Sequence, residues 1–199
     1  DLRAAIDRHG PDALRYFLLR EVPWDADGNF TWERFDARYT SELADGYGNL
    51  ASRILAMIKR YLGGVVPHSG TATELDAAGD RAIADYRSAM DDHLIHEGGN
   101  AAWGLVARAN RFVEESAPWD LAKQGDTEQL DRVLASLGQG LARITLMAAP
   151  FMPGKAGLVW QALGREGNVN EAKWSDLESP ALGGRTVTKL APLFPKIPP

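Results

Sequence analysis

Apolar residues recur at three- and four-residue steps along most of the chain, which is the spacing of an amphipathic helix. This spacing predicts helices over residues 11–21, 34–62, 74–93, 100–117, 127–149 and 154–163. No alternation of strand and helix patterns occurs from which a parallel nucleotide-binding sheet could be built. The pattern therefore predicts an all-α fold, a bundle of helices packed around one core.

Glycine and proline set the predicted helix ends. Pro11 suits the first turn of a helix, Gly63 and Gly64 suit a left-handed stop, and Pro118 ends the helix that precedes it. Turn-forming residues predict short loops after residue 24 and after residue 64.

The last part of the chain, residues 164–199, has little helical periodicity. Its five prolines argue against a core helix, whereas Val187, Leu190 and Phe194 argue against disorder. We expect a partly extended strap that packs back on the bundle, with a short strand over 186–189.

Composition narrows the class of protein. A chain of 199 residues fits one domain, or one and a small annex. The absence of cysteine rules out disulfides and thiolate metal sites, which suits the cytoplasm, and no apolar run approaches the ~20 residues of a membrane span. A net charge of −5 argues against strong nonspecific binding to nucleic acid, but leaves room for a few specific contacts.

The candidate chemistry lies in two short strings. An ideal α-helix turns roughly 100° per residue. With the position of Leu43 around the helix axis taken as zero, Asn49 falls near −120° and Arg53 near −80°, so both lie beside the apolar stripe of the helix predicted over 34–62. An amide can read a base edge and a guanidinium can hold a phosphate. Trp119 follows Pro118 at a rigid corner and could stack on a base. Without further information, Asn49 is also explained as a surface residue and Trp119 as a core anchor.

Several strings in order along the chain resemble one family, the methionyl-tRNA synthetases. The matching strings are Asp12-Ala13-Leu14-Arg15-Tyr16-Phe17-Leu18-Leu19-Arg20-Glu21, Gly48-Asn49-Leu50-Ala51-Ser52-Arg53, Asn110-Arg111-Phe112-Val113, Ala117-Pro118-Trp119-Asp120-Leu121-Ala122-Lys123, Ala149-Pro150-Phe151-Met152-Pro153 and Leu193-Phe194-Pro195-Lys196. The resemblance covers the family's helical anticodon-binding region, after its catalytic domain. It implies an antiparallel helix bundle of the class I synthetase type in three parts: a stem-contact segment (1–35), the anticodon-binding bundle (36–163) and the C-terminal strap (164–199).

The resemblance also implies a function and its residues. Asn49, Arg53, Trp119 and Pro118 would contact a CAU anticodon, in initiator and elongator methionine tRNA. Arg60 and Lys123 are candidates for the tRNA backbone, although Lys59 and Arg60 are equally explained by the dipole at a helix C-terminus.

The strings His-Ile-Gly-His and Lys-Met-Ser-Lys-Ser of the family's ATP site do not occur, and no phosphate-binding loop does. We therefore expect no catalytic residue and no cofactor here, and read the chain as a fragment. ATP, and zinc where the parent has it, would bind in the missing catalytic domain, which would be its partner in cis.

Two other readings remain open from the sequence. The chain could be a synthetase-derived helical module that binds proteins and no longer binds RNA, which the acidic net charge favours. His93 and His96, three apart beside acidic residues, could hold a metal. Gly98 and Gly99, however, predict a fraying helix end there with solvated side chains, so we expect no metal site.

Overall fold

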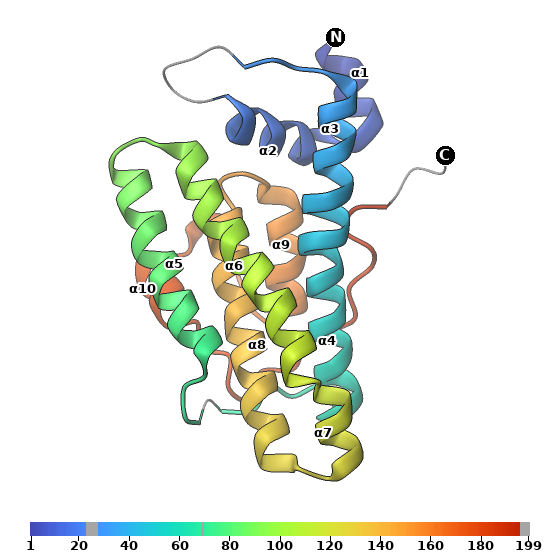
Figure 1. Ribbon diagram of the computed structural model, residues 1–199, viewed down its shortest axis with the longest axis vertical. Helices are drawn as coiled ribbons and strands as arrows, with labels where there is room; N and C mark the ends of the chain where they lie inside the picture. Colours follow the sequence, from blue (N-terminus) through green and yellow to red (C-terminus); the bar gives the residue numbers. More distant parts are fainter. Residues whose placement is uncertain (23–27, 69, 196–199) are drawn as a thin grey trace.

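The computed structural model describes residues 1–22, 28–68 and 70–195, and most of them are helical (Figure 1). The elements are α1 (Leu2–His9), α2 (Pro11–Glu21), α3 (Trp32–Arg38), the π-helix η1 (Tyr39–Gly48), α4 (Asn49–Tyr61), α5 (Glu74–Asp91), α6 (Ile95–Ser116), α7 (Pro118–Gln124), α8 (Thr127–Ala148), α9 (Pro153–Ala162), the 3-10 helix η2 (Val169–Glu171) and α10 (Trp174–Glu178). The predicted all-α fold is confirmed. Within these ranges the only β pairing is a single antiparallel bridge between Val65 and Thr186.

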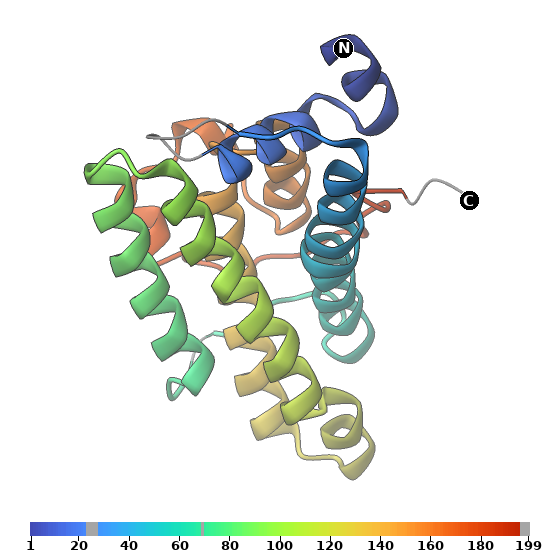
Figure 2. The same cartoon turned by 45° about the horizontal axis from the view of Figure 1, so that its top comes forward.

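The long helices run side by side along the long axis of the molecule. Figures 1 and 2 show the column α3–η1–α4 on one side and α5 on the other, with α6 and α8 between them. The short helix α2 lies across one end of this bundle, and α7 lies at the opposite end. Helix α8 is the centre of the core, because Leu134, Leu137, Leu141, Ile144 and Met147 are all fully buried.

No helix within the described ranges is long and apolar enough to cross a lipid bilayer.

The predicted helix over 34–62 is wrong in one respect, since it is not a single α-helix. Ten of its residues, which form η1, are a π-helix, in which backbone bonds span five residues. Side chains from α6 support the widened turns: Trp103 Nε1 donates to the carbonyl of Glu42 at 3.2 Å, and Asn110 Nδ2 donates to that of Gly46 at 3.3 Å. Angles counted from Leu43 at 100° per residue therefore do not hold beyond η1.

The expectation of a fraying helix end at Gly98 and Gly99 is also wrong. Both glycines lie buried in the first turns of α6. A Cβ at Gly99 would come within 2.5 Å of Arg20 Cδ, and one at Gly98 within 2.9 Å of Met90 Sδ. The two glycines are packing positions that let α6 approach its neighbours.

Helix α1, which the sequence did not predict, is tied to the column beside it. The ring of His9 stacks on Tyr39 with 3.8 Å between centroids, and His9 Nε2 lies 2.7 Å from Asp36. Arg8 also holds Asp36, through two hydrogen bonds. The loop expected after 24 falls mostly on residues 23–27, outside the described residues.

The last part of the chain packs back on the bundle. Val187, Leu193 and Phe194 are buried, and the backbone amide of Val187 donates to the carbonyl of Gly64 at 2.8 Å. The segment is less extended than predicted, because it forms η2 and α10, and the expected strand over 186–189 amounts to the bridge at Thr186. Lys196, the last residue of the Leu-Phe-Pro-Lys string, lies outside the described residues.

Candidate nucleic-acid interface

Asn49 and Arg53 stand one turn apart at the start of α4. Asn49 is exposed, whereas Leu50 and Ile54 beside it are fully buried. Arg60 lies two turns beyond Arg53 on the same side of this regular helix, since offsets of four and eleven residues return to within about 40° of Asn49. The three polar side chains therefore form one stripe that borders the core.

Arg53 is paired across the bundle with an acid that the sequence did not single out. Its Nη2 lies 2.6 Å from Glu114 Oε1, on the last turns of α6. The side chains of Arg53 and Glu114 are 32% and 61% exposed. An ion pair this open contributes little, about 0–1 kcal/mol, so an incoming anion can replace Glu114 at small cost. No local pattern reveals this pair, because its partners lie 61 positions apart.

A sharp corner joins α6 to α7 and presents Trp119. Ala117 has φ 41° and ψ 62°, a left-handed conformation that is uncommon for alanine. Pro118 begins α7, where its missing N–H is not needed, and its side chain is buried. Trp119 is therefore the second residue of a helix rather than the end of a loop, and it remains 38% exposed. Trp119 is therefore not a fully buried core anchor, and its stacking on a base stays a prediction.

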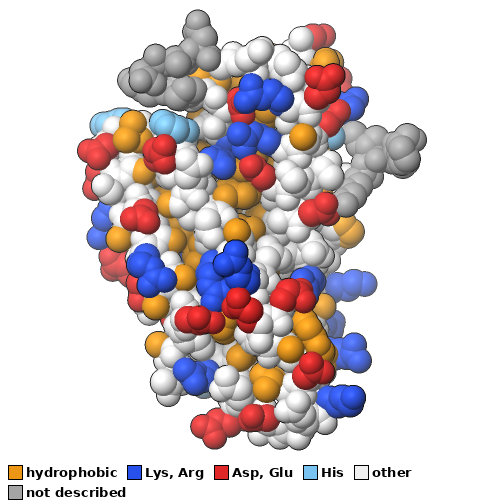
Figure 3. Space-filling view, viewed as in Figure 1, with side chains coloured by type: hydrophobic (Ala, Val, Ile, Leu, Met, Phe, Trp, Pro, Cys, Tyr) orange, Lys and Arg blue, Asp and Glu red, His pale blue; other side chains and the backbone are white. Residues whose placement is uncertain are grey.

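The two basic residues predicted to contact the tRNA backbone lie on α7 and α4. Lys123 lies one turn after Trp119 on α7, and both side chains are exposed. Arg60 is exposed in the last turn of α4, with its guanidinium 5.5 Å from the ring centre of Tyr61. In Figure 3, basic side chains follow the lower right edge of the molecule, over α4 and α7. The helix dipole remains a sufficient explanation for Arg60.

A pocket of about 280 Å³ lies beside Asn49 on the flank away from Arg53. It is lined by Asn49, Ser52 and Asp45, and closed by Leu193 and Phe194 from the last part of the chain. Gly48 permits this closure, since a Cβ there would come within 3.1 Å of Phe194 Cδ2. Polar groups that can pair with a base edge thus adjoin an apolar surface.

The Arg53–Glu114 ion pair links α4, which carries the end of the first string, to the last turn of α6, just before the second string. Asn49, Arg53 and Arg60 belong to α4, while Pro118, Trp119 and Lys123 belong to α7. Glu114, five residues before Trp119, holds Arg53 and so joins α4 to the corner that begins α7.

The histidines weighed as metal ligands lie on different elements. His93, with φ 61°, follows the end of α5, whereas His96 lies in the first turn of α6, with Nε2 at 3.4 Å from Glu97. Among residues 1–22, 28–68 and 70–195, no three His, Cys, Asp or Glu side chains gather as metal ligands would.

Two family models match the chain. The model described as tRNA synthetases class I (M) matches residues 1–55, and the one described as the anticodon binding domain of methionyl tRNA ligase matches residues 66–198.

Relatives of known name agree with these models. The methionine–tRNA ligase of Listeria monocytogenes serotype 4b is 38% identical over 202 residues, covering 96% of this chain and 30% of the relative. That of Streptomyces coelicolor is 35% identical over 201 residues, covering 94% and 37%. The chain thus spans about a third of the length of these curated relatives.

Solved structures show the same fold. The apo crystal structure of Mycobacterium tuberculosis methionyl-tRNA synthetase has a TM-score of 0.90 at 29% identity, covering 100% of this chain and 41% of that one. The form of that synthetase bound by methionyl-adenylate has a TM-score of 0.85 at 29% identity, covering 98% and 40%.

Proposed function

The chain belongs to the methionyl-tRNA synthetase family and carries its anticodon-binding domain, and from this premise we propose that it selects tRNA by reading a CAU anticodon. Initiator and elongator methionine tRNA are the proposed partners, because both carry this anticodon. Sequence-specific RNA recognition mostly targets bases splayed out of loops, and an anticodon loop offers such bases.

Three groups of different chemistry carry the proposal. The exposed amide of Asn49 can donate to and accept from one base edge, and the Arg53 guanidinium can hold a second base or a phosphate. The accessible ring of Trp119 can stack on a base, a contact that contributes about 1–3 kcal/mol in single-strand binders. What supports their acting together is the Arg53–Glu114 pair, which joins the helix of Asn49 and Arg53 to the corner that presents Trp119.

The negative charge of Glu114 would make the surface selective, because it competes with RNA phosphates for Arg53. A phosphate that approaches Arg53 meets the Glu114 carboxylate first, so backbone contacts made at random are penalised. A loop that is docked correctly by its bases exchanges the Glu114 contact for its own. This suits a chain of net charge −5, which has little general attraction for RNA. Arg60 and Lys123 are the proposed contacts to the tRNA backbone.

The wider activity is proposed from the relatives. The whole protein would attach methionine to tRNA with ATP, in the cytoplasm where tRNA is used, and the ATP site would lie in a catalytic region outside these residues. We propose that this region docks in cis on the end of the bundle that carries α1 and α2. Large apolar side chains are exposed there, at Leu2, Leu18, Val22, Phe30 and Trp32. We retain residues 1–35, 36–163 and 164–199 as the proposed stem-contact, anticodon-binding and strap parts.

The test is binding of the 199-residue chain to initiator tRNA, and to the same tRNA with one anticodon base changed, at low salt. Trp119→Ala and Asn49→Ala should each weaken binding of the CAU tRNA at least tenfold. Trp32→Ala is the matched control, because Trp32 is exposed to a similar degree, 41% against 38%, at the other end of the bundle. Measurable binding that ignores both the anticodon change and Trp119→Ala would overturn the proposal.

A further inference from the structure

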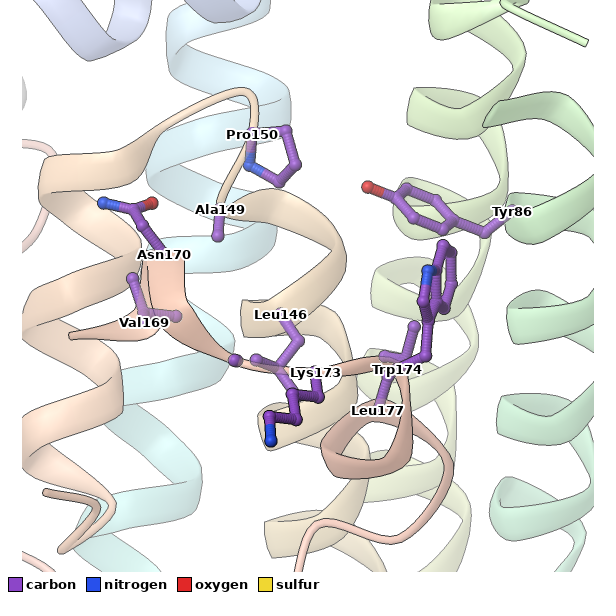
Figure 4. Close-up of a pocket in the computed structure, with 10 residues that line it drawn as sticks. Tyr86, Leu146, Ala149, Pro150, Val169, Asn170, Lys173, Trp174 and Leu177 are labelled. Atoms are coloured by element: carbon purple, nitrogen blue, oxygen red, sulfur yellow. The ribbon is translucent and has the colours of Figure 1, made fainter. Parts of the chain in front are cut away.

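A second hollow lies away from the α4 and α7 surface, on the side of the bundle that carries α5 and α10. It has a volume of about 420 Å³, within the range of about 300–1,000 Å³ that suits small molecules. Its walls come from separate elements: Tyr86 from α5, Leu146 from the end of α8, Ala149 just after it, Asn170 from η2, and Trp174 and Leu177 from α10 (Figure 4).

Tyr86 brings a polar group into this mainly apolar space. The residue is only 4% exposed, and in Figure 4 its hydroxyl points into the hollow. None of the hydrogen bonds found among the described residues uses that hydroxyl, and it is not one of the fully buried side-chain atoms that lack a partner, so it stays accessible from the hollow. Burial raises the pKa of the Tyr86 phenol, so the group remains a protonated donor. A ligand in the hollow could therefore accept a hydrogen bond from Tyr86 without displacing a partner within the protein.

Trp174 forms the aromatic part of the wall. Its ring meets that of Tyr86 edge to face, with centroids 6.0 Å apart, yet 43% of the residue is exposed. The Arg87 guanidinium lies 4.8 Å from the Trp174 ring centre and is itself held by Glu178 at 2.6 Å. Two aromatic rings set at an angle, one of them open to solvent, suit a planar ligand.

Lys173 is the only charged side chain among the ten described residues that line the hollow. In Figure 4 its nitrogen lies at the lower edge, away from the Tyr86 hydroxyl, so the two polar groups stand at opposite ends of an apolar space. The nearby carboxylate of Asp176 already accepts from Arg165 at 2.9 Å and from the Lys173 backbone amide at 2.9 Å. A ligand anion at this edge would therefore meet a positive charge.

We propose that this hollow binds a small planar aromatic acid. Its ring would lie against Tyr86 and Trp174, a carbonyl or similar acceptor would take the Tyr86 hydrogen bond, and its carboxylate would face Lys173. The site is separate from the proposed RNA-binding residues, because none of its lining residues belongs to α4 or α7. A ligand there would join α5 and α8 to η2 and α10.

The probe is 6-acetyl-2-naphthoate, which has a ketone at one end and a carboxylate at the other, with its methyl ester as the uncharged counterpart. The readout is the set of indole N–H signals in a ¹⁵N–¹H NMR titration of the 199-residue chain. The signal of Trp174 is assigned by its loss in Trp174→Phe, and that of Trp32 in the same way. Trp32 is the internal control, because it is equally exposed and lies at another end of the bundle.

We expect saturable movement of the Trp174 signal with a dissociation constant of about 0.1–1 mM, as suits a ligand of about 16 non-hydrogen atoms. Lys173→Met should weaken the acid at least threefold and leave the ester unchanged. Tyr86→Phe removes only a hydroxyl and should weaken both at least threefold. A Trp174 signal that moves no more than that of Trp32, or acid binding that Lys173→Met leaves unchanged, would overturn the proposal.

Discussion

Replacing Glu114 with glutamine should strengthen RNA binding, because it releases Arg53 from its partner. The pair joins Arg53 Nη2 to Glu114 Oε1 at 2.6 Å, and its side chains are 32% and 61% exposed. Such an open pair contributes at most about 1 kcal/mol, so its loss should raise the affinity for CAU tRNA by no more than about fivefold. One further cation becomes available to phosphate, so the plot of log K against log salt should steepen by about 0.7, the value for single strands.

Glu115→Gln is the matched control for this prediction. It changes the net charge by the same amount at the next position, but Glu115 Oε2 holds Arg108 Nη1, at 2.9 Å, rather than Arg53. The assay is filter binding or anisotropy of labelled tRNA at four salt concentrations between 50 and 200 mM. If both variants change affinity and salt slope equally, the effect is general electrostatics and Arg53 is not held in reserve by Glu114. If Glu114→Gln weakens binding, the carboxylate itself contacts RNA.

Three predictions concern stability, measured by urea unfolding. Hydrogen bonding by Arg8 holds the pKa of the Asp36 carboxyl below its usual range. Stability from this contact is therefore present above about pH 4 and is lost as pH falls through the lowered pKa, so Asp36→Asn should destabilise more at pH 7 than at pH 2.5. An equal effect at both pH values would contradict this. Gly79→Ala would place Cβ 2.5 Å from Arg143 Nη1, so the buried guanidinium would have to move and lose contacts. This loss of about 1–3 kcal/mol should outweigh the gain of about 1 kcal/mol in helix propensity, so the variant should be less stable. A more stable variant would show that Arg143 moves freely. Phe194→Ala should cost about 3–5 kcal/mol, because the ring is buried, whereas an unchanged midpoint would mean that the strap does not contribute to the core.

The sequence predicted the elements whose signals are local. Pro11 and the apolar run after it define α2, which spans 11–21 as predicted, and the stripe of α8 is recovered to within a residue at its end. The π-helix could not be predicted in this way. Its carbonyls are bonded by Trp103 and Asn110, about 60 residues further on, and periodicity within a segment carries no information on such donors.

In the candidate site, too, local features could be predicted from the sequence, whereas contacts between distant segments could not. The exposure of Asn49 follows from the spacing of the buried residues Leu50, Ile54 and Ile58 within α4, so the sequence could predict it. Whether Trp119 is exposed or a core anchor was left open by the sequence. Glu114 could not be found, since nothing in its own neighbourhood distinguishes it from Glu115. The choice between them depends on how α4 crosses α6, which is a property of the packed bundle.

The strap of the last residues has a consequence for synthesis on the ribosome. The hydroxyl of Tyr39 donates to the carbonyl of Pro195, across 156 positions of sequence. At about 5–20 residues per second, Tyr39 is made about 8–30 s before its acceptor. During that interval the pocket beside Gly48 lacks the wall that Leu193 and Phe194 form. The helices around it can pack together, but without these side chains. A chain that is cut short before Leu193 and Phe194 would therefore have an open apolar flank next to Asn49, which chaperones and proteases would meet first.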